Sequence, residues 1–85
     1  MTLEAFRQLK LPDKVCLVVA TGTYLGQRWR LREQLHLYHL PDAAAGFFVE
    51  LGYEHRLDTI VVVRSFTDVA ALDAYTSQVR LPQLL

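Results

Sequence analysis

Apolar side chains occupy both alternating sets of positions between Thr23 and Phe66. The first set comprises Leu25, Trp29, Leu31, Leu35, Leu37, Phe47, Val49, Leu51, Tyr53, Ile60 and Val62. The second set still includes Tyr24, Tyr38, Leu40, Phe48, Val61 and Val63. Because a sheet with one face in water alternates apolar with polar residues, this pattern predicts a sheet with two covered faces. A chain this short cannot easily cover both faces alone, so we expect a partner or a second copy on one of them.

Turn residues divide this region into four predicted strands, at residues 23–31, 34–40, 46–53 and 59–65. Connections this short join antiparallel neighbours, so the expected sheet is a four-stranded meander. Matching core residues across the strands places Trp29 opposite Leu37, and Leu37 opposite Val49. In this register Trp29 is predicted to be a principal core residue on the sheet face that the C-terminal helix covers.

The residues before the strands are predicted to be helical. Thr2 is a suitable N-cap for a short amphipathic helix over residues 3–10, which Pro12 ends. Residues 12–22 fit a second helix, with proline in its first turn and Gly22 at its end. Their side chains are strand formers by propensity, so an extra strand is the alternative for this segment.

After the strands, Thr67 is a suitable cap for a C-terminal helix that Asp68 opens. The apolar stripe of this helix is Val69, Leu72, Tyr75 and Val79, and Pro82 prevents its continuation. We therefore predict a single α+β domain over residues 1–85. It has one or two short N-terminal helices, a four-stranded antiparallel β-meander and a C-terminal helix packed on one sheet face.

The composition narrows the classes of function. Nine basic and nine acidic residues give a formal net charge of zero, which argues against general binding to polyanions and leaves self-association unopposed. The single cysteine excludes an internal disulfide, and no Cys/His spacing is typical of a zinc site. We expect no metal or cofactor, and oligomerisation is the available source of extra stability for so small a domain.

The N-terminal segment lacks the pattern of a secretory signal, and the longest apolar run, residues 15–20, is too short to cross a bilayer. A cytoplasmic protein without a membrane partner is therefore expected. Arginine outnumbers lysine and asparagine is absent, a bias that indicates a GC-rich bacterial genome.

The second set of apolar positions defines a predicted interaction face. The assumed register aligns Arg28, Tyr38 and Phe48 in one row, and Arg30, His36 and Glu50 in the next. We predict a non-enzymatic protein-interaction module that forms a homo-oligomer, a dimer, through this face; a protein encoded by a neighbouring gene is a further candidate partner. The predicted face consists of Tyr24, Arg28, Arg30, Tyr38, Phe48, Glu50, Val61 and Val63.

Nucleic-acid binding is the first alternative function. Bases stack on sheet aromatics while arginines bind phosphate, and the stripe Arg28, Arg30 and Arg32 lies beside tyrosines. Alternating arginines are also typical of an edge strand that resists pairing, and neither a ribonucleoprotein motif nor a phosphate-binding loop is present. We therefore favour the edge-strand explanation of these arginines over nucleic-acid binding.

A small-molecule site or an enzyme is the third function considered. In the assumed register His36 and Glu50 lie side by side and could line a ligand pocket. Alternatively, His36 is a base that the Glu50 carboxylate orients, which is the minimum arrangement for general acid-base chemistry. Cross-strand charge pairing explains the same two residues without catalysis, so no catalytic residue is assigned.

Several short runs follow one another in a recognisable order. They are Gly22-Thr23-Tyr24-Leu25, Leu37-Tyr38-His39-Leu40, Phe47-Phe48-Val49-Glu50-Leu51 with Tyr53, Arg64-Ser65-Phe66, and Leu72 with Tyr75. In this order the chain resembles a group of short uncharacterised bacterial proteins. The resemblance spans nearly the whole chain and rests on hydrophobic spacing and a few aromatics. It implies a stand-alone small domain and implies no activity.

Overall fold

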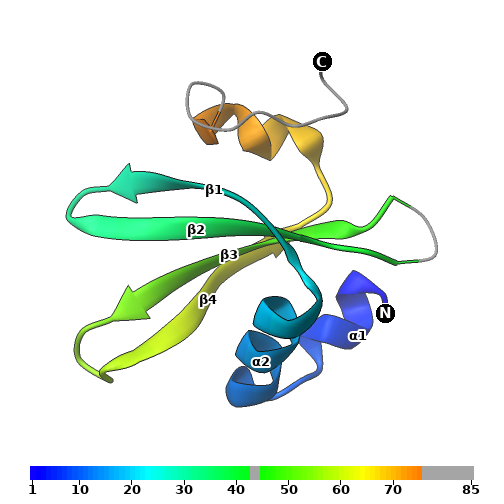
Figure 1. Ribbon diagram of the computed structural model, residues 1–85, viewed down its shortest axis with the longest axis horizontal. Coiled ribbons are helices and arrows are strands. Elements are labelled where there is room, and N and C mark those ends of the chain that lie inside the picture. The colour runs from blue at the N-terminus through cyan, green and yellow to red at the C-terminus, as the bar shows by residue number, and fades with distance from the viewer. Residues whose placement is uncertain (43–44, 76–85) are drawn as a thin grey trace.

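The computed structural model describes the backbone of residues 1–42 and 45–75. Two helices precede four strands, and a 3-10 helix follows them (Figure 1). The elements are α1 (Leu3–Arg7), α2 (Leu11–Thr21), β1 (Thr23–Arg30), β2 (Glu33–Leu40), β3 (Phe47–Glu54), β4 (Thr59–Phe66) and η1 (Val69–Tyr75). All neighbouring strands are antiparallel, in the order β1-β2-β3-β4. The predicted α+β class and antiparallel meander are confirmed.

Both predicted N-terminal helices are present, and the alternative of an extra strand is excluded. The Thr2 hydroxyl caps α1 by accepting the backbone N–H of Ala5 at 3.1 Å. Gly22 ends α2 by donating its N–H to the Val18 carbonyl at 2.8 Å, with extended backbone in place of the left-handed conformation common at helix ends. A β-carbon at Gly22 would lie 2.6 Å from that carbonyl oxygen, so glycine is needed for the close turn into β1.

The C-terminal element differs from the prediction in type and in cap. The described part is the 3-10 helix η1, and its cap is Asp68, whose carboxylate accepts the Ala70 N–H at 2.9 Å. Leu72 is buried against the sheet as predicted, but Val69 is exposed. The predicted continuation through Val79 to Pro82 lies outside the described residues.

The register of the first two strands is set by the turn between them. Leu31 and Arg32 form a two-residue turn, so Arg30 pairs with Glu33 and Trp29 with Gln34. A bulge between Tyr24 and Gly26 then shifts the pairing by one residue. The predicted opposition of Trp29 and Leu37 is wrong, because matching core residues cannot detect a tight turn or a bulge.

The pairing of β2 with β3 also differs from the prediction by one residue. Leu37 pairs with Glu50, and Val49 pairs with Tyr38. Since a slip of one residue turns a strand over, Val49 and Leu37 lie on opposite faces of the sheet, each in a different core cluster.

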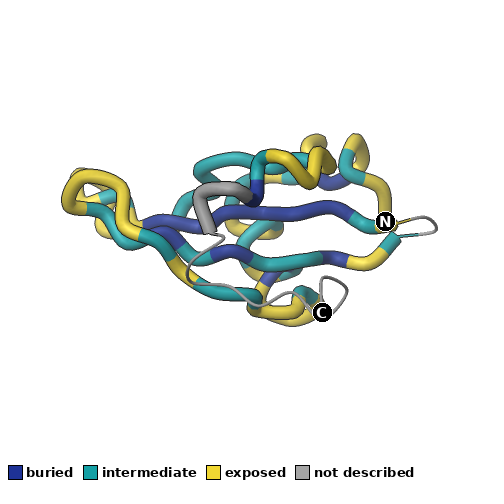
Figure 2. Tube along the Cα trace, turned by 90° about the horizontal axis from the view of Figure 1, so that it is seen from above, coloured by how far each residue is buried: buried dark blue, intermediate teal, exposed yellow. Residues whose placement is uncertain are grey.

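The sheet is the middle of three layers, and each of its faces carries a core cluster. Beneath α1 and α2 the buried residues are Phe6, Val18, Leu40, Phe47, Val49 and Leu51. Beneath η1 they are Leu37, Phe48 and Leu72, with Leu25 and Phe66 packed around them. Figure 2 shows the buried segments running through the middle of the molecule and the exposed segments at the turns. The chain thus covers part of both faces by itself.

The sheet divides into two arms at one end. Strands β2 and β3 pair only from His36 opposite Leu51 to Leu40 opposite Phe47, whereas each hairpin continues to its own turn. We call residues 27–35 the first arm and residues 52–60 the second arm; Figure 1 shows them diverging away from the helices. At the point of division a β-carbon on Gly52 would lie 2.9 Å from Leu35 Cδ2. Glycine therefore leaves room for Leu35 to pack across the gap.

Candidate functional site: a cleft between two hairpin arms

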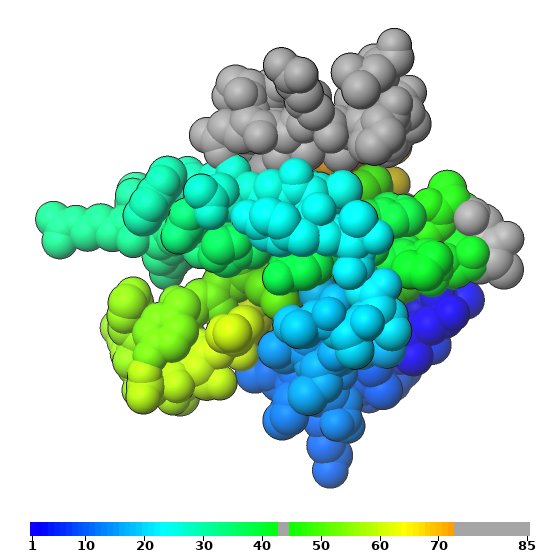
Figure 3. Space-filling model, viewed as in Figure 1, coloured from blue at the N-terminus to red at the C-terminus, as the bar shows by residue number. Residues whose placement is uncertain are grey.

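The divergence of the arms leaves a cleft, with a volume of about 420 Å³, on the side of the sheet that α2 flanks. Figure 3 shows the arms as separate lobes with a gap between them. The lining residues are Val19, Trp29, Arg32, Glu33, Gln34, His36, Tyr38, Leu51, Gly52, Tyr53, His55 and Ile60. Ligand sites in proteins measure roughly 300–1,000 Å³, so the cleft is large enough to receive a small molecule or a protruding side chain.

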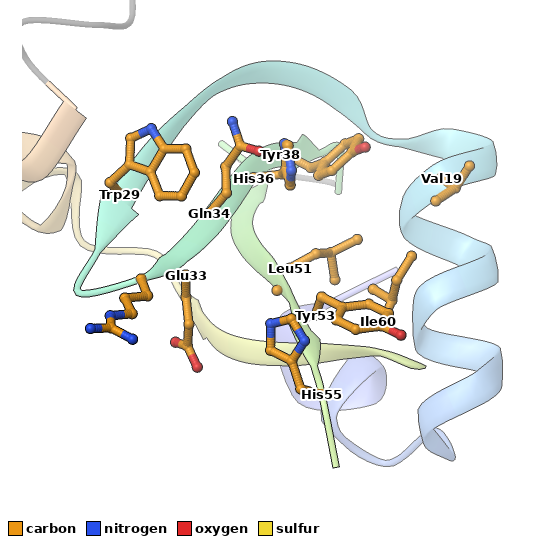
Figure 4. A pocket seen from close by; sticks show the side chains of 12 residues that line it. Val19, Trp29, Glu33, Gln34, His36, Tyr38, Leu51, Tyr53, His55 and Ile60 are labelled. Atoms are coloured by element: carbon orange, nitrogen blue, oxygen red, sulfur yellow. The ribbon is translucent and has the colours of Figure 1, made fainter. Parts of the chain in front are cut away.

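Four of the lining residues are large, apolar and exposed. Trp29, Val19, Ile60 and Tyr53 are between 41% and 63% exposed and come from β1, α2, β4 and β3. Figure 4 shows them around a single hollow, with Trp29 on one side and Tyr53, Ile60 and Val19 on the other. Exposed apolar residues scattered singly need no explanation, but a group that surrounds one hollow is typical of an interaction surface.

Aromatic side chains form one wall of the cleft, where His36 and Tyr38 line it and Tyr24 contacts both of them. The Tyr24 hydroxyl lies 3.3 Å from Nδ1 of His36, and the rings of Tyr24 and Tyr38 are 5.4 Å apart. Partial burial raises the pKa of the Tyr24 hydroxyl, and the neighbouring Tyr38 adds to this shift. The phenol therefore keeps its proton at neutral pH and is suited to donate a hydrogen bond, not to act as a base.

Charged residues lie at the outer rim of the cleft. Arg30 Nη2 is 2.9 Å from Glu33 Oε2 in an ion pair that is exposed on both sides. Between the arm tips, Arg32 and His55 border a second hollow together with this pair and Leu31. The cleft thus has an apolar interior and a polar rim, the usual anatomy of a protein interface.

The predicted interaction face is not a single surface. Phe48 is buried in the cluster beneath η1, and Arg28 binds Glu50 on that same face. Tyr38 packs against the cluster beneath α1 and α2, with Tyr24 beside it. The bulge and the true register separate these residues. The remaining members are Arg30 at the rim, and Val61 and Val63 partly buried on β4.

The predicted pair of His36 and Glu50 is also not brought together. His36 lines the cleft and contacts Tyr24, whereas the Glu50 carboxylate lies on the opposite face of the sheet between Arg28 and Arg64. A base with an orienting carboxylate is therefore not formed by these residues.

The three arginines proposed for nucleic-acid binding do not form one stripe. Arg28 is held by the buried carboxylate of Glu50, and Arg30 is paired with Glu33. Only Arg32 makes no ion pair with the residues that the structure describes. Two of the three side chains are therefore already paired with carboxylates.

We accordingly expect no salt-dependent binding of mixed single-stranded oligonucleotides. If Arg30 and Arg32 bound phosphates, log affinity would fall with log salt by about 0.7 per contact. Fluorescence anisotropy over a salt series measures this slope for the native chain and for an Arg30→Gln/Arg32→Gln double variant. A micromolar affinity that weakens with salt and disappears in the double variant would contradict the expectation.

Other kinds of site have little support within residues 1–42 and 45–75. No group of three or more His, Cys, Asp or Glu side chains there is placed to hold a metal ion. None of the helices in that part of the chain is long and apolar enough to cross a membrane. The register expected from the sequence pairs β2 and β3 along their whole length and therefore does not predict a cleft. Gly52 inside β3 was the available signal.

No protein-family model, curated protein or solved structure matches this chain.

Proposed function

We propose that this protein is a non-enzymatic interaction module that self-associates through the cleft surface, defined as Val19, Trp29, Tyr53 and Ile60. The observation that carries the proposal is the gathering of these four exposed apolar side chains, from four elements, around one hollow. Tryptophan and tyrosine are enriched among the residues that contribute most to protein interfaces. A small neutral chain offers little electrostatic resistance to meeting a second copy.

The proposed surface differs from the face expected from the sequence, but the mode of action is the same. Each square ångström of apolar surface removed from water contributes about 25 cal/mol. Phe48 is already covered by η1, so association cannot gain much there. Trp29 is 63% exposed, the most of the four residues of the cleft surface, and as the largest of them it has the most surface to bury in a dimer.

Sedimentation or light scattering of the native chain is expected to show a reversible monomer–dimer equilibrium. Replacing Trp29 by serine should raise the dimer dissociation constant at least about 30-fold, since a central interface residue contributes about 2 kcal/mol or more. Leu57→Ser is the matched control, because Leu57 is exposed in the β3–β4 turn and does not line the cleft. Circular dichroism confirms that both variants remain folded.

A native chain that stays monomeric at high micromolar concentration would overturn the proposal. A dimer that is equally stable with serine at position 29 would show that the interface lies elsewhere.

A small-molecule ligand is the second candidate occupant, favoured by the volume of the cleft and by the Tyr24–His36 hydrogen bond at its wall. Such a ligand would use Trp29 as well, so it would compete with self-association. A compound that stabilises the monomer and dissociates the dimer would support this second function over the first.

A further inference from the structure

The turn at the end of the first arm carries an apolar side chain that the fold of one chain does not explain. Leu31 is 95% exposed, and its backbone has φ of 56°. Two-residue hairpin turns normally place Asn, Asp or Gly in this left-handed conformation, because a β-carbon is strained there. Neither burial nor backbone preference within the monomer favours leucine at this position.

The Leu31 turn is next to the cleft. Arg32 and Glu33, which follow Leu31 directly, line the cleft itself. Leu31 also borders the second hollow between the arm tips, opposite His55 of the second arm. One end of the molecule therefore presents a protruding apolar side chain beside a recessed apolar surface.

The two arm tips carry opposite charge. At the tip of the first arm, residues 30–33, Arg30 and Arg32 outnumber Glu33 by two to one, a net charge of +1. In the second arm, Glu54 and Asp58 outnumber Arg56 by two to one, a net charge of −1 with His55 neutral. A second copy of the same chain can place its first arm near the second arm of its partner, where the charges attract.

We propose that two copies interlock, with Leu31 of each copy entering the cleft of the other. This inference rests on the proposed self-association and specifies its geometry. Because the protruding residue and the cleft are adjacent on each chain, one two-fold axis satisfies both contacts at once. A contact that repeats reciprocally closes a dimer, whereas a head-to-tail contact would build an open chain.

Complementation between two variants tests this arrangement. Leu31→Asp removes the protruding apolar group and leaves the cleft intact, whereas Ile60→Lys places a positive charge in the cleft and leaves Leu31 intact, so the second contact of a mixed dimer brings opposite charges together. Each variant alone should dimerise at least about tenfold more weakly than the native chain, a loss of 1.4 kcal/mol or more. Mixed together, they should form a heterodimer, because Leu31 of the cleft variant can enter the intact cleft of the other.

The control is a mixture of two differently labelled Leu31→Asp chains, which should associate no more tightly than the single variant because neither supplies the protruding group. Leu31→Gly is a second variant that relieves the turn, so it should raise the melting temperature of the monomer while weakening the dimer. This opposite change in stability and association separates a role in the interface from a role in folding.

The results of this experiment distinguish the interlocked geometry from self-association in general. A native dimer that survives Leu31→Asp, or two monomeric variants that fail to rescue one another, would overturn the interlocked geometry and leave self-association standing. A native chain that is monomeric throughout would overturn both proposals. Heterodimer formation with tighter binding than either variant alone would support reciprocal insertion.

Discussion

Replacing Glu50 by alanine is expected to lower the free energy of unfolding by about 3–5 kcal/mol. The Glu50 side chain is fully buried, with Oε2 3.0 Å from Arg28 Nε and Oε1 3.2 Å from Arg64 Nε. The Arg28 side chain is itself only 17% exposed, so truncation removes a carboxylate that offsets a largely buried charge. Arg64 also donates to the Ala71 carbonyl of η1, and the network therefore joins β1, β3, β4 and η1. Chemical denaturation of the variant and the native chain measures the difference.

Glu33→Ala is the matched control for Glu50, since it removes the other Arg–Glu pair of the first arm. Both members of the Arg30–Glu33 pair are exposed, and exposed pairs contribute about 1 kcal/mol or less. An equal loss of stability in the two variants would show that burial of the Glu50 network has no particular effect.

Replacing Phe47 by alanine is expected to cost about 3–5 kcal/mol of folding stability. Its ring is fully buried beneath α1, 5.4 Å from the ring of Phe6. Truncation would leave a cavity between the helix and the sheet. Trp29→Ala removes a larger side chain, yet it should change the stability of the monomer by only about 0.5 kcal/mol, as surface substitutions do.

The Trp29 comparison requires a protein concentration at which the native chain is monomeric, because loss of a dimer would also lower the apparent stability. A cost for Trp29→Ala as large as that for Phe47→Ala would place Trp29 in the core, as the alternating pattern of the sequence predicts.

The order and type of most elements could be predicted from local signals. Thr2 as a cap, Pro12 in a first turn and the short connections between apolar runs each indicate a structure within a few residues of the chain. The core character of Phe47 and Val49 also followed from the alternating pattern, although α1 and α2 cover them and not the C-terminal helix that was expected there. Each of these features is determined by interactions between residues that are close in the sequence.

The faces of the sheet could not be predicted in the same way. The bulge between Tyr24 and Gly26, and the turn that gives Leu31 a left-handed backbone, reverse which side chains share a face. Opposite to expectation, Phe48 lies in a core because η1 covers its face, and Trp29 is exposed because it lies in the first arm, beyond the residues where β2 and β3 pair. The candidate site could not be predicted either, because the cleft between the arms exists only where β2 and β3 stop pairing.

Trp29 is the single tryptophan of the chain, so its fluorescence reports directly on the proposed interface. Its emission should lie at the long wavelength of a hydrated indole when the protein is dilute. As the concentration rises, we expect a shift to shorter wavelength, with the same midpoint as the doubling of mass in sedimentation. A mass that doubles while the emission stays unchanged, or a chain that stays monomeric with hydrated Trp29, would contradict self-association through the cleft surface.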